Sequence, residues 1–194
     1  MTHAVTVALA ALGIVGQIAA VALLVAALLA VFGVHGPLRF SRELVWGNEL
    51  WLTFVVAAVA TLGSLFFSEI TDFFPCKLCW FQRICMYPLA IVVPLMALAH
   101  DRRAARYVLP LPIIGIPFTI YHMLIERGIV EQAKTCLISA PGGCATKWIE
   151  EFGYVTIPTL ALTSFVLCIV LLVFAILSER EDAAMSSHTP TADG

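Results

Sequence analysis

Charged residues are scarce in this 194-residue chain, and their scarcity excludes several classes of protein. Asp, Glu, Lys and Arg make up 12% of the residues, where a soluble domain has about a quarter, and 61% of the residues are hydrophobic. The net charge is only -2 and no cluster of Lys or Arg occurs, which argues against a nucleic-acid partner. With a mean hydropathy of +0.96, the composition predicts an integral membrane protein.

Other features are missing as well. No metal or flavin motif and no internal repeat is evident, and six cysteines are too few for a disulfide scaffold, so the position of each cysteine matters more than the number. The first apolar run lacks the positively charged start of a signal peptide and is roughly twice the usual 7–15 residues of its hydrophobic region. We therefore predict that this run is a retained helix.

Five apolar segments are long enough to cross a bilayer, which takes about 20 residues. We predict spanning helices over residues 5–34, 50–67, 79–99 (beginning at Cys79 or Trp80), 107–125 and 155–177. Prolines in the fourth segment are compatible with a helix in a bundle, where neighbouring helices satisfy the freed carbonyl groups. The polar residues 178–194 predict a disordered tail. The predicted fold class is an all-α, polytopic membrane helix bundle.

Arginines in two short connections predict the orientation. Residues 36–49 hold two of them and residues 100–106 hold three, so the positive-inside rule places both connections in the cytoplasm. The N-terminus and residues 68–79 and 126–154 then lie outside, and the C-terminal tail lies inside. The longer outer connection carries three basic residues, but four glutamates balance them.

Four cysteines fall in the two outward connections. Cys76 and Cys79 form a C-x-x-C pair at the start of the third predicted helix, and Cys136 and Cys144 bracket a turn-prone loop. A helix N-terminus favours the thiolate, which is the nucleophile of disulfide exchange. If this side of the membrane is oxidising, disulfides can persist there, and the C-x-x-C pair predicts reversible redox chemistry.

The Cys136–Cys144 pair could close a small disulfide ring. Closing so short a loop adds little stability, and a second cysteine pair lies on the same side, so we favour disulfide exchange over a structural clip. Four outward cysteines also raise the possibility of zinc, but the seven-residue spacer and the lack of a nearby histidine disfavour it. Cys85 and Cys168, inside predicted helices, are interpreted as small buried apolar residues.

Arg83 lies one turn deeper than Cys79 on the same helical face. An arginine inside a span costs about 2.5–3.5 kcal/mol to insert, which makes a functional role the first hypothesis. Arg83 could stabilise a Cys79 thiolate or hydrogen-bond a carbonyl oxygen of a lipid-soluble oxidant; the alternative is an arginine that snorkels and anchors the helix. His122 and Glu126, one turn apart, could line a quinone site or relay protons, or His122 could be merely interfacial.

Residues 147–154, KWIEEFGY, allow two interpretations. Their apolar residues share one helical stripe, which fits a short helix on the outer interface. They also fit an aromatic belt that leads into the fifth predicted helix. The pattern does not decide between the two.

The stretch PCKLCWFQRICMYPL, residues 75–89, resembles the P-C-x-L-C-W-x-Q-R-x-x-M-Y-P-L signature of the DsbB family of disulfide-bond-formation proteins, especially its BdbC-like branch. YHMLIERG (121–128) and FGYVTIPTLALTSF (152–165) resemble later segments of that family. The resemblance implies a four-helix core over residues 50–177, preceded by an extra helix and connection (1–49) and followed by the tail (178–194). The extra helix places the N-terminus outside, as the arginines do.

The resemblance also implies a protein-dithiol:quinone oxidoreductase of the bacterial cell membrane. Such an enzyme reoxidises an extracytoplasmic, DsbA-like thioredoxin-fold partner and passes the electrons to ubiquinone or menaquinone, without a metal or flavin. Cys136 would exchange with the partner, and Cys144 would resolve. Cys76 would receive the exchange from the loop pair, and Cys79 would face the quinone. The implied quinone-binding residues are Gln82, Arg83 and His122.

Two other functions fit part of the pattern. An enzyme like vitamin K epoxide reductase performs the same chemistry on a related bundle, but its C-x-x-C normally follows the loop pair in the chain, whereas here it precedes that pair. A structural, tetraspanin-like protein would bridge its outer cysteines permanently. That alternative predicts a larger outer domain and gives no reason for Arg83.

Overall fold

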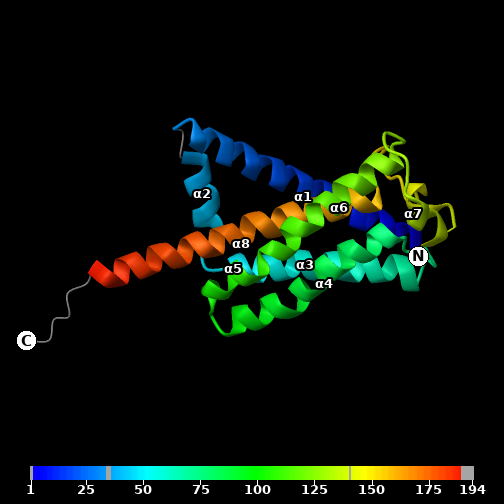
Figure 1. Cartoon of the computed structure of the whole chain (residues 1–194). Helices are drawn as coiled ribbons and strands as arrows, with labels where there is room; N and C mark the ends of the chain where they lie inside the picture. The colour runs from blue at the N-terminus through cyan, green and yellow to red at the C-terminus, as the bar shows by residue number, and fades with distance from the viewer. Residues whose placement is uncertain (1, 34–35, 140, 189–194) are drawn as a thin grey trace, which may run out of the picture.

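The computed structural model describes residues 2–33, 36–139 and 141–188, and these residues form helices and turns without a β-strand. The helices are α1 (Thr2–Val31), α2 (Gly36–Val45), α3 (Glu49–Glu69), α4 (Lys77–Leu98), η1 (Arg102–Ala104), α5 (Ala105–Val108), α6 (Pro110–Glu126), α7 (Lys134–Ser139), η2 (Gly143–Ala145) and α8 (Ile157–His188). The protein is an all-α helix bundle, as predicted (Figure 1).

Among the described residues, five stretches are long and apolar enough to cross a membrane, namely 3–26, 49–69, 77–98, 102–126 and 157–180. They correspond to the five predicted segments, with different ends. Helix α4 begins at Lys77, earlier than predicted, because Cys76 caps it. The fourth stretch is divided at Leu109, because Pro110 cannot continue the hydrogen bonding of α5 and instead takes the first position of α6.

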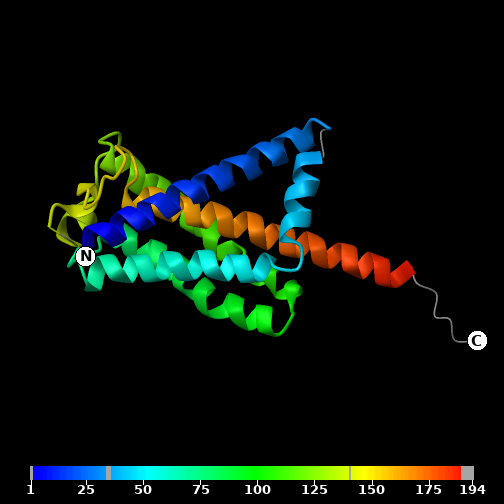
Figure 2. The same cartoon turned by 180° about the vertical axis from the view of Figure 1, so that it is seen from behind.

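Helices α3, α4, α6 and α8 pack together as the four-helix core (Figures 1 and 2). Leu89, Phe165 and Leu172 are fully buried at its centre. The α6–α8 contact is close because Gly115 has no side chain: a Cβ there would overlap the ring of Phe165. Burying an aromatic ring contributes about 1.5–3 kcal/mol, so this contact helps to fix how α8 sits against α6.

Helix α1 lies outside the four-helix core and packs along α8. Figures 1 and 2 show that it starts beside the loops near α7, diverges from α3 along its length, and is connected back to α3 by α2. The N-terminus therefore lies at the same end as the cysteine-bearing connections, and the C-terminal end of α8 lies at the other. We call these the cysteine end and the arginine end.

One local prediction is wrong. Helix α8 runs to His188, so residues 178–188 are helical rather than disordered, and residues 189–194 lie outside the described part of the chain. Ion pairs stabilise this extension: Arg102 lies 2.7 Å from Asp182, and Arg103 lies 2.8 Å from Glu179.

Of the two interpretations of residues 147–154, the structure excludes the interfacial helix. Phe152 and Gly153 both have positive φ angles, 54° and 77°, and the chain turns there to form a short bridge between Glu151 and Val155. A left-handed pair of residues is incompatible with a continuous right-handed helix.

Candidate redox site

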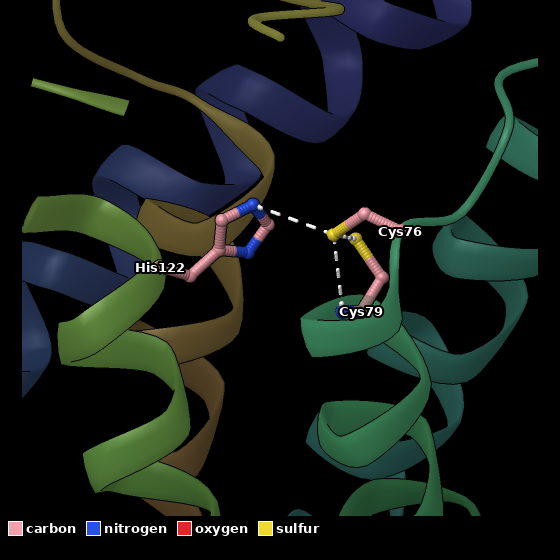
Figure 3. Close-up of side chains that lie close together, drawn as sticks. All are labelled: Cys76, Cys79 and His122. Atoms are coloured by element: carbon pink, nitrogen blue, oxygen red, sulfur yellow. Dashed lines mark hydrogen bonds between the residues drawn. The ribbon is translucent and has the colours of Figure 1, made fainter. Parts of the chain in front are cut away.

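The two cysteines of the C-x-x-C pair meet at the first turn of α4. Cys76 is the N-cap residue, and its Sγ accepts a hydrogen bond from the backbone N–H of Cys79 at 3.4 Å. The two sulfur atoms lie 3.2 Å apart and are free thiols (Figure 3). The spacing C-x-x-C produces this approach because an N-cap side chain folds over the amide group of the third helical residue.

Cys76 is the cysteine of this pair whose surroundings stabilise the thiolate form. It lies just outside the membrane-spanning part of α4 and is 3% exposed. Donation from the Cys79 thiol is the largest effect on it and outweighs the burial that raises the pKa. The hydrogen bond from His122 also favours the thiolate. Together these contacts lower the pKa of Cys76 to about 4, so its sulfur is ionised at neutral pH.

His122 connects the C-x-x-C pair to the loop. Its Nε2 lies 3.7 Å from Cys76 Sγ and 3.1 Å from the backbone oxygen of Cys144, and its Nδ1 lies 3.2 Å from Nε2 of Gln82. Because an amide nitrogen can only donate, Nδ1 is an acceptor, and the Nε2–H is left to face the sulfur and the carbonyl oxygen. Figure 3 shows the ring reaching from α6 toward Cys76.

The loop cysteines form a disulfide, one of the arrangements that the sequence allows. Cys136 and Cys144 are bonded, with their Cα atoms 5.4 Å apart, and both are buried. They share one buried cluster with Cys76 and Ile125. Gly143 has a φ of 71° and no room for a Cβ, which would overlap the side chain of Gln132. The loop is therefore folded tightly over the C-x-x-C pair.

A cavity of about 300 Å³ lies inside the membrane-spanning region, next to the site. Cys79, Gln82 and Arg83 contribute to its wall from α4. Most of the remaining wall is apolar and comes from α1, α3 and α8. The aromatic residues that line the cavity are Phe67, Tyr87 and Phe165. An apolar cavity with a few polar groups at one place is typical of a small-molecule binding site. Cys79 therefore faces a space that an apolar ligand can occupy, while Cys76 faces the loop.

Arg83 is held within the span rather than at its edge. Its side chain is largely buried, its Nε donates to Ser64 Oγ and its Nη2 to the Ser64 carbonyl oxygen, both at 2.9 Å. The guanidinium carbon lies 5.3 Å from the ring centre of Trp80 and 5.9 Å from that of Tyr87. This geometry does not match an arginine that snorkels to the interface. Sequence analysis missed Ser64, which no motif marks.

Three potential metal ligands also meet here. Ligand atoms of Cys76, Cys79 and His122 lie within 4.8 Å of one another. A structural zinc site takes four such ligands, and within the described part of the chain no fourth cysteine, histidine or carboxylate joins this group. The group therefore has one ligand fewer than a structural zinc site.

Comparison with known proteins identifies the region that carries this site. The model of the family described as "Disulfide bond formation protein DsbB" matches residues 47–175. Disulfide bond formation protein C of Bacillus subtilis is 44% identical over 126 residues, which are 62% of this chain and 87% of that protein. The probable disulfide formation protein of Deinococcus radiodurans is 44% identical over 133 residues, 64% of this chain and 86% of that protein.

A more distant relative is the probable disulfide formation protein of Metapseudomonas resinovorans, 37% identical over 127 residues, which are 65% of this chain and 88% of that protein. No solved structure matches the chain. The matched region contains α3, α4 and α6, the first part of α8 and all the cysteines of the site, whereas α1 and α2 precede it.

Proposed function

The chain belongs to the DsbB family of disulfide-bond-formation membrane proteins, and from this premise we propose that it oxidises a DsbA-like thioredoxin-fold partner and passes the electrons to a membrane quinone. The observation that carries the proposal is the position of the C-x-x-C pair. Cys76 shares the imidazole of His122 with the loop disulfide, and Cys79 lies on the cavity wall. One pair of sulfur atoms thus contacts both the loop and the acceptor site.

The first step takes place at the loop. A partner thiolate attacks Cys136, and Cys144 leaves as a thiolate; the second partner thiol then attacks the mixed disulfide. The partner leaves oxidised, and Cys136 and Cys144 are left as a dithiol. Because Cys136 is only 3% exposed, the loop must move before the partner can reach this sulfur.

The second step moves the electron pair to α4. A thiolate of the reduced loop attacks Cys76 in a Cys76–Cys79 disulfide, and the electrons pass to Cys79 as that bond breaks. The second loop thiol then displaces Cys76, which restores the loop disulfide. The structure has the bonding of this product, with Cys136–Cys144 bridged and Cys76 and Cys79 free. The low pKa of Cys76 makes it a good leaving group.

The third step uses the cavity. A bound ubiquinone or menaquinone would supply the capacity to accept two electrons and two protons. When Cys76 and Cys79 form a disulfide, the thiolate and the thiol together release two electrons and one proton, and the second proton that the quinone takes up comes from water. We assign Arg83 to hydrogen bonding a quinone oxygen and His122 to proton movement beside Cys76. Gln82, whose amide nitrogen donates to Nδ1 of His122, orients the imidazole ring. The sequence predicted all three as quinone-binding residues; the structure places only Gln82 and Arg83 on the cavity wall, with His122 beside the sulfur atoms.

The orientation of the bundle follows from the same proposal. The cysteine end must face the compartment that contains the partner, so the N-terminus and both cysteine connections lie outside the bacterial cell membrane. The arginine end then faces the cytoplasm, as the positive-inside rule requires. Family membership favours this function over the enzyme that resembles vitamin K epoxide reductase and over the tetraspanin-like scaffold.

The test measures both half-reactions in membranes that contain the full chain. A reduced thioredoxin-fold partner is added, and its oxidation and the reduction of the quinone are followed together. We expect Cys79→Ser to abolish quinone reduction, while Cys136 and Cys144 still exchange once with the partner. Cys85→Ala, which changes a lone buried cysteine of the same helix, is the matched control. Inert disulfides and no quinone reduction by the unmodified protein would contradict the proposal.

A further inference from the structure

We propose that α1, which precedes the family-matched region, forms one side of the opening through which the tail of the quinone leaves the cavity, and so influences which quinones fit. This inference rests on the function proposed above. It assigns a role to the extra helix, for which sequence analysis found none. Five residues of α1 line the cavity, namely Leu9, Leu12, Gly13, Val15 and Gly16.

The attachment of α1 to α8 depends on two glycines. A Cβ on Gly13 would overlap the side chain of Leu160, and a Cβ on Gly16 would lie 3.2 Å from Thr163 and 3.3 Å from Leu167. Both glycines therefore let the two helices approach more closely than larger residues would allow. Leu160, Thr163 and Leu167 also line the cavity, so this contact forms part of the cavity wall.

On its other side, α1 approaches α3. Both terminal carbons of Leu9 lie 3.5 Å from the position of a Cβ on Gly63, and both residues line the cavity. Beyond this contact α1 diverges from α3 toward α2 (Figure 2). The two helices therefore meet near the cysteine end and separate toward the arginine end.

The cavity opens toward lipid where α1 and α3 separate. Leu12 and Val15 on α1 are 52% and 63% exposed, and Val55 on α3 is 52% exposed, although all three also line the cavity. A residue that both lines a cavity and is half exposed lies at its rim. The rim formed by these three side chains is apolar and lies within the membrane-spanning stretches.

This arrangement fits a quinone better than a compact ligand. The polar groups of Cys79, Gln82 and Arg83 lie on the α4 side of the cavity, whereas the rim between α1 and α3 is apolar. A volume of about 300 Å³ is at the small end for ligand sites, so a head group fits inside while a long isoprenoid chain has to continue outward. The apolar rim is a path along which that chain can leave the cavity.

The experiment compares two tryptophan substitutions on α1. Leu12→Trp places a bulky ring at the rim, whereas Ile18→Trp adds the same ring at a position that is 65% exposed and is not part of the cavity wall. The probes are decylubiquinone and a ubiquinone with a single isoprene unit. KM and kcat are measured for each with the reduced thioredoxin-fold partner, and exchange at the loop is measured separately.

We expect Leu12→Trp to raise KM for the long-tailed quinone by about fourfold for each tail methylene group that loses its apolar contact, with a smaller rise for the short-tailed one. Ile18→Trp should leave both KM values unchanged, and neither substitution should change the rate of exchange at the loop. Leu12→Ala, which widens the rim, should reduce the difference in KM between the two quinones. This variant keeps the test possible if Leu12→Trp folds poorly.

The decisive quantity is the ratio of KM for the long-tailed quinone to KM for the short-tailed one. The role of α1 would be overturned if this ratio were the same in the unmodified protein and in Leu12→Trp, Leu12→Ala and Ile18→Trp. That result is distinct from failure of the proposed function. If the unmodified protein reduces neither quinone, the proposed function is wrong; if it reduces both and only the α1 variants lack an effect, the inference about α1 alone is wrong.

Discussion

Replacing Arg83 by alanine should slow electron transfer to the quinone without slowing exchange at the loop. Two of the three guanidinium nitrogens already donate to Ser64, so Nη1 is the nitrogen that we expect to meet a quinone oxygen. The phenol group of Tyr87 donates to Ser64 Oγ at 3.3 Å, and this contact helps to fix the serine. The guanidinium group is therefore held in place before any ligand binds.

The size of the effect follows from the kind of contact that is lost. A hydrogen bond from a charged donor contributes about 1.5–3 kcal/mol, and about 1.4 kcal/mol corresponds to a tenfold change. Arg83→Ala should thus lower kcat/KM for the quinone by about tenfold to a hundredfold. Arg83→Lys should recover only part of this loss, because lysine cannot donate to Ser64 and to a quinone through one planar group.

The assay separates the two half-reactions. Quinone reduction is measured with the Cys76–Cys79 pair already reduced, and loop exchange is measured with a reduced thioredoxin-fold partner in the absence of quinone. Ser64→Ala is the matched variant, because it removes the Oγ acceptor and leaves the backbone oxygen that Arg83 also contacts. We expect its effect on quinone reduction to lie between those of Arg83→Lys and the unmodified protein.

Unchanged quinone kinetics in a folded Arg83→Ala protein would refute this reasoning and reduce Arg83 to a structural residue. Equal losses in both half-reactions would also count against it, since they would indicate a general disturbance of the site. Helical content and formation of the Cys136–Cys144 disulfide report whether each variant has folded.

The thiolate absorbance of Cys76, measured as the ultraviolet difference from Cys76→Ser, should rise with a midpoint near pH 4 and be complete at neutral pH. His122→Phe should move this midpoint to higher pH. A midpoint at the pH of an ordinary thiol in the unmodified protein would contradict the assigned contacts. A thioredoxin-fold partner without its resolving thiol should form a mixed disulfide at Cys136, most durably in Cys144→Ser, as mapped by non-reducing electrophoresis; a trap at Cys76 or Cys79 with the loop still bridged would reject the relay order. After mild reduction of intact cells, a membrane-impermeant maleimide should label Cys136 and Cys144, whereas labelling only after lysis would invert the proposed orientation.

The parts of the fold that depend on local pattern were predictable. Five spans follow from runs of apolar residues, and the C-x-x-C pair at a helix start follows from spacing alone. The ends of the helices were less accurate, because capping by Cys76 and the ion pairs of Arg102 and Arg103 depend on three-dimensional contacts.

The site was predictable as a set of residues but not as an arrangement. Sequence analysis placed His122 at a quinone, but its contacts with Cys76 and Cys144 depend on how α6 packs against α4 and the loop. Spacing along the chain carries no information about such a contact between helices. For the same reason, sequence analysis missed the contact of Ser64 with Arg83 and could not predict that α1 lines the cavity.

The contact between Gly115 and Phe165 limits which substitutions the protein can tolerate at these two positions. The Phe165 ring lines the cavity on one side and fills the space of the absent Gly115 side chain on the other. Even a methyl group at position 115 would therefore displace the ring, and with it part of the cavity wall. Substitutions at these two positions should be epistatic, since contacting residues do not contribute additively. The shape of the cavity thus depends jointly on Phe165 of α8 and on Gly115 of α6, although Gly115 does not line the cavity.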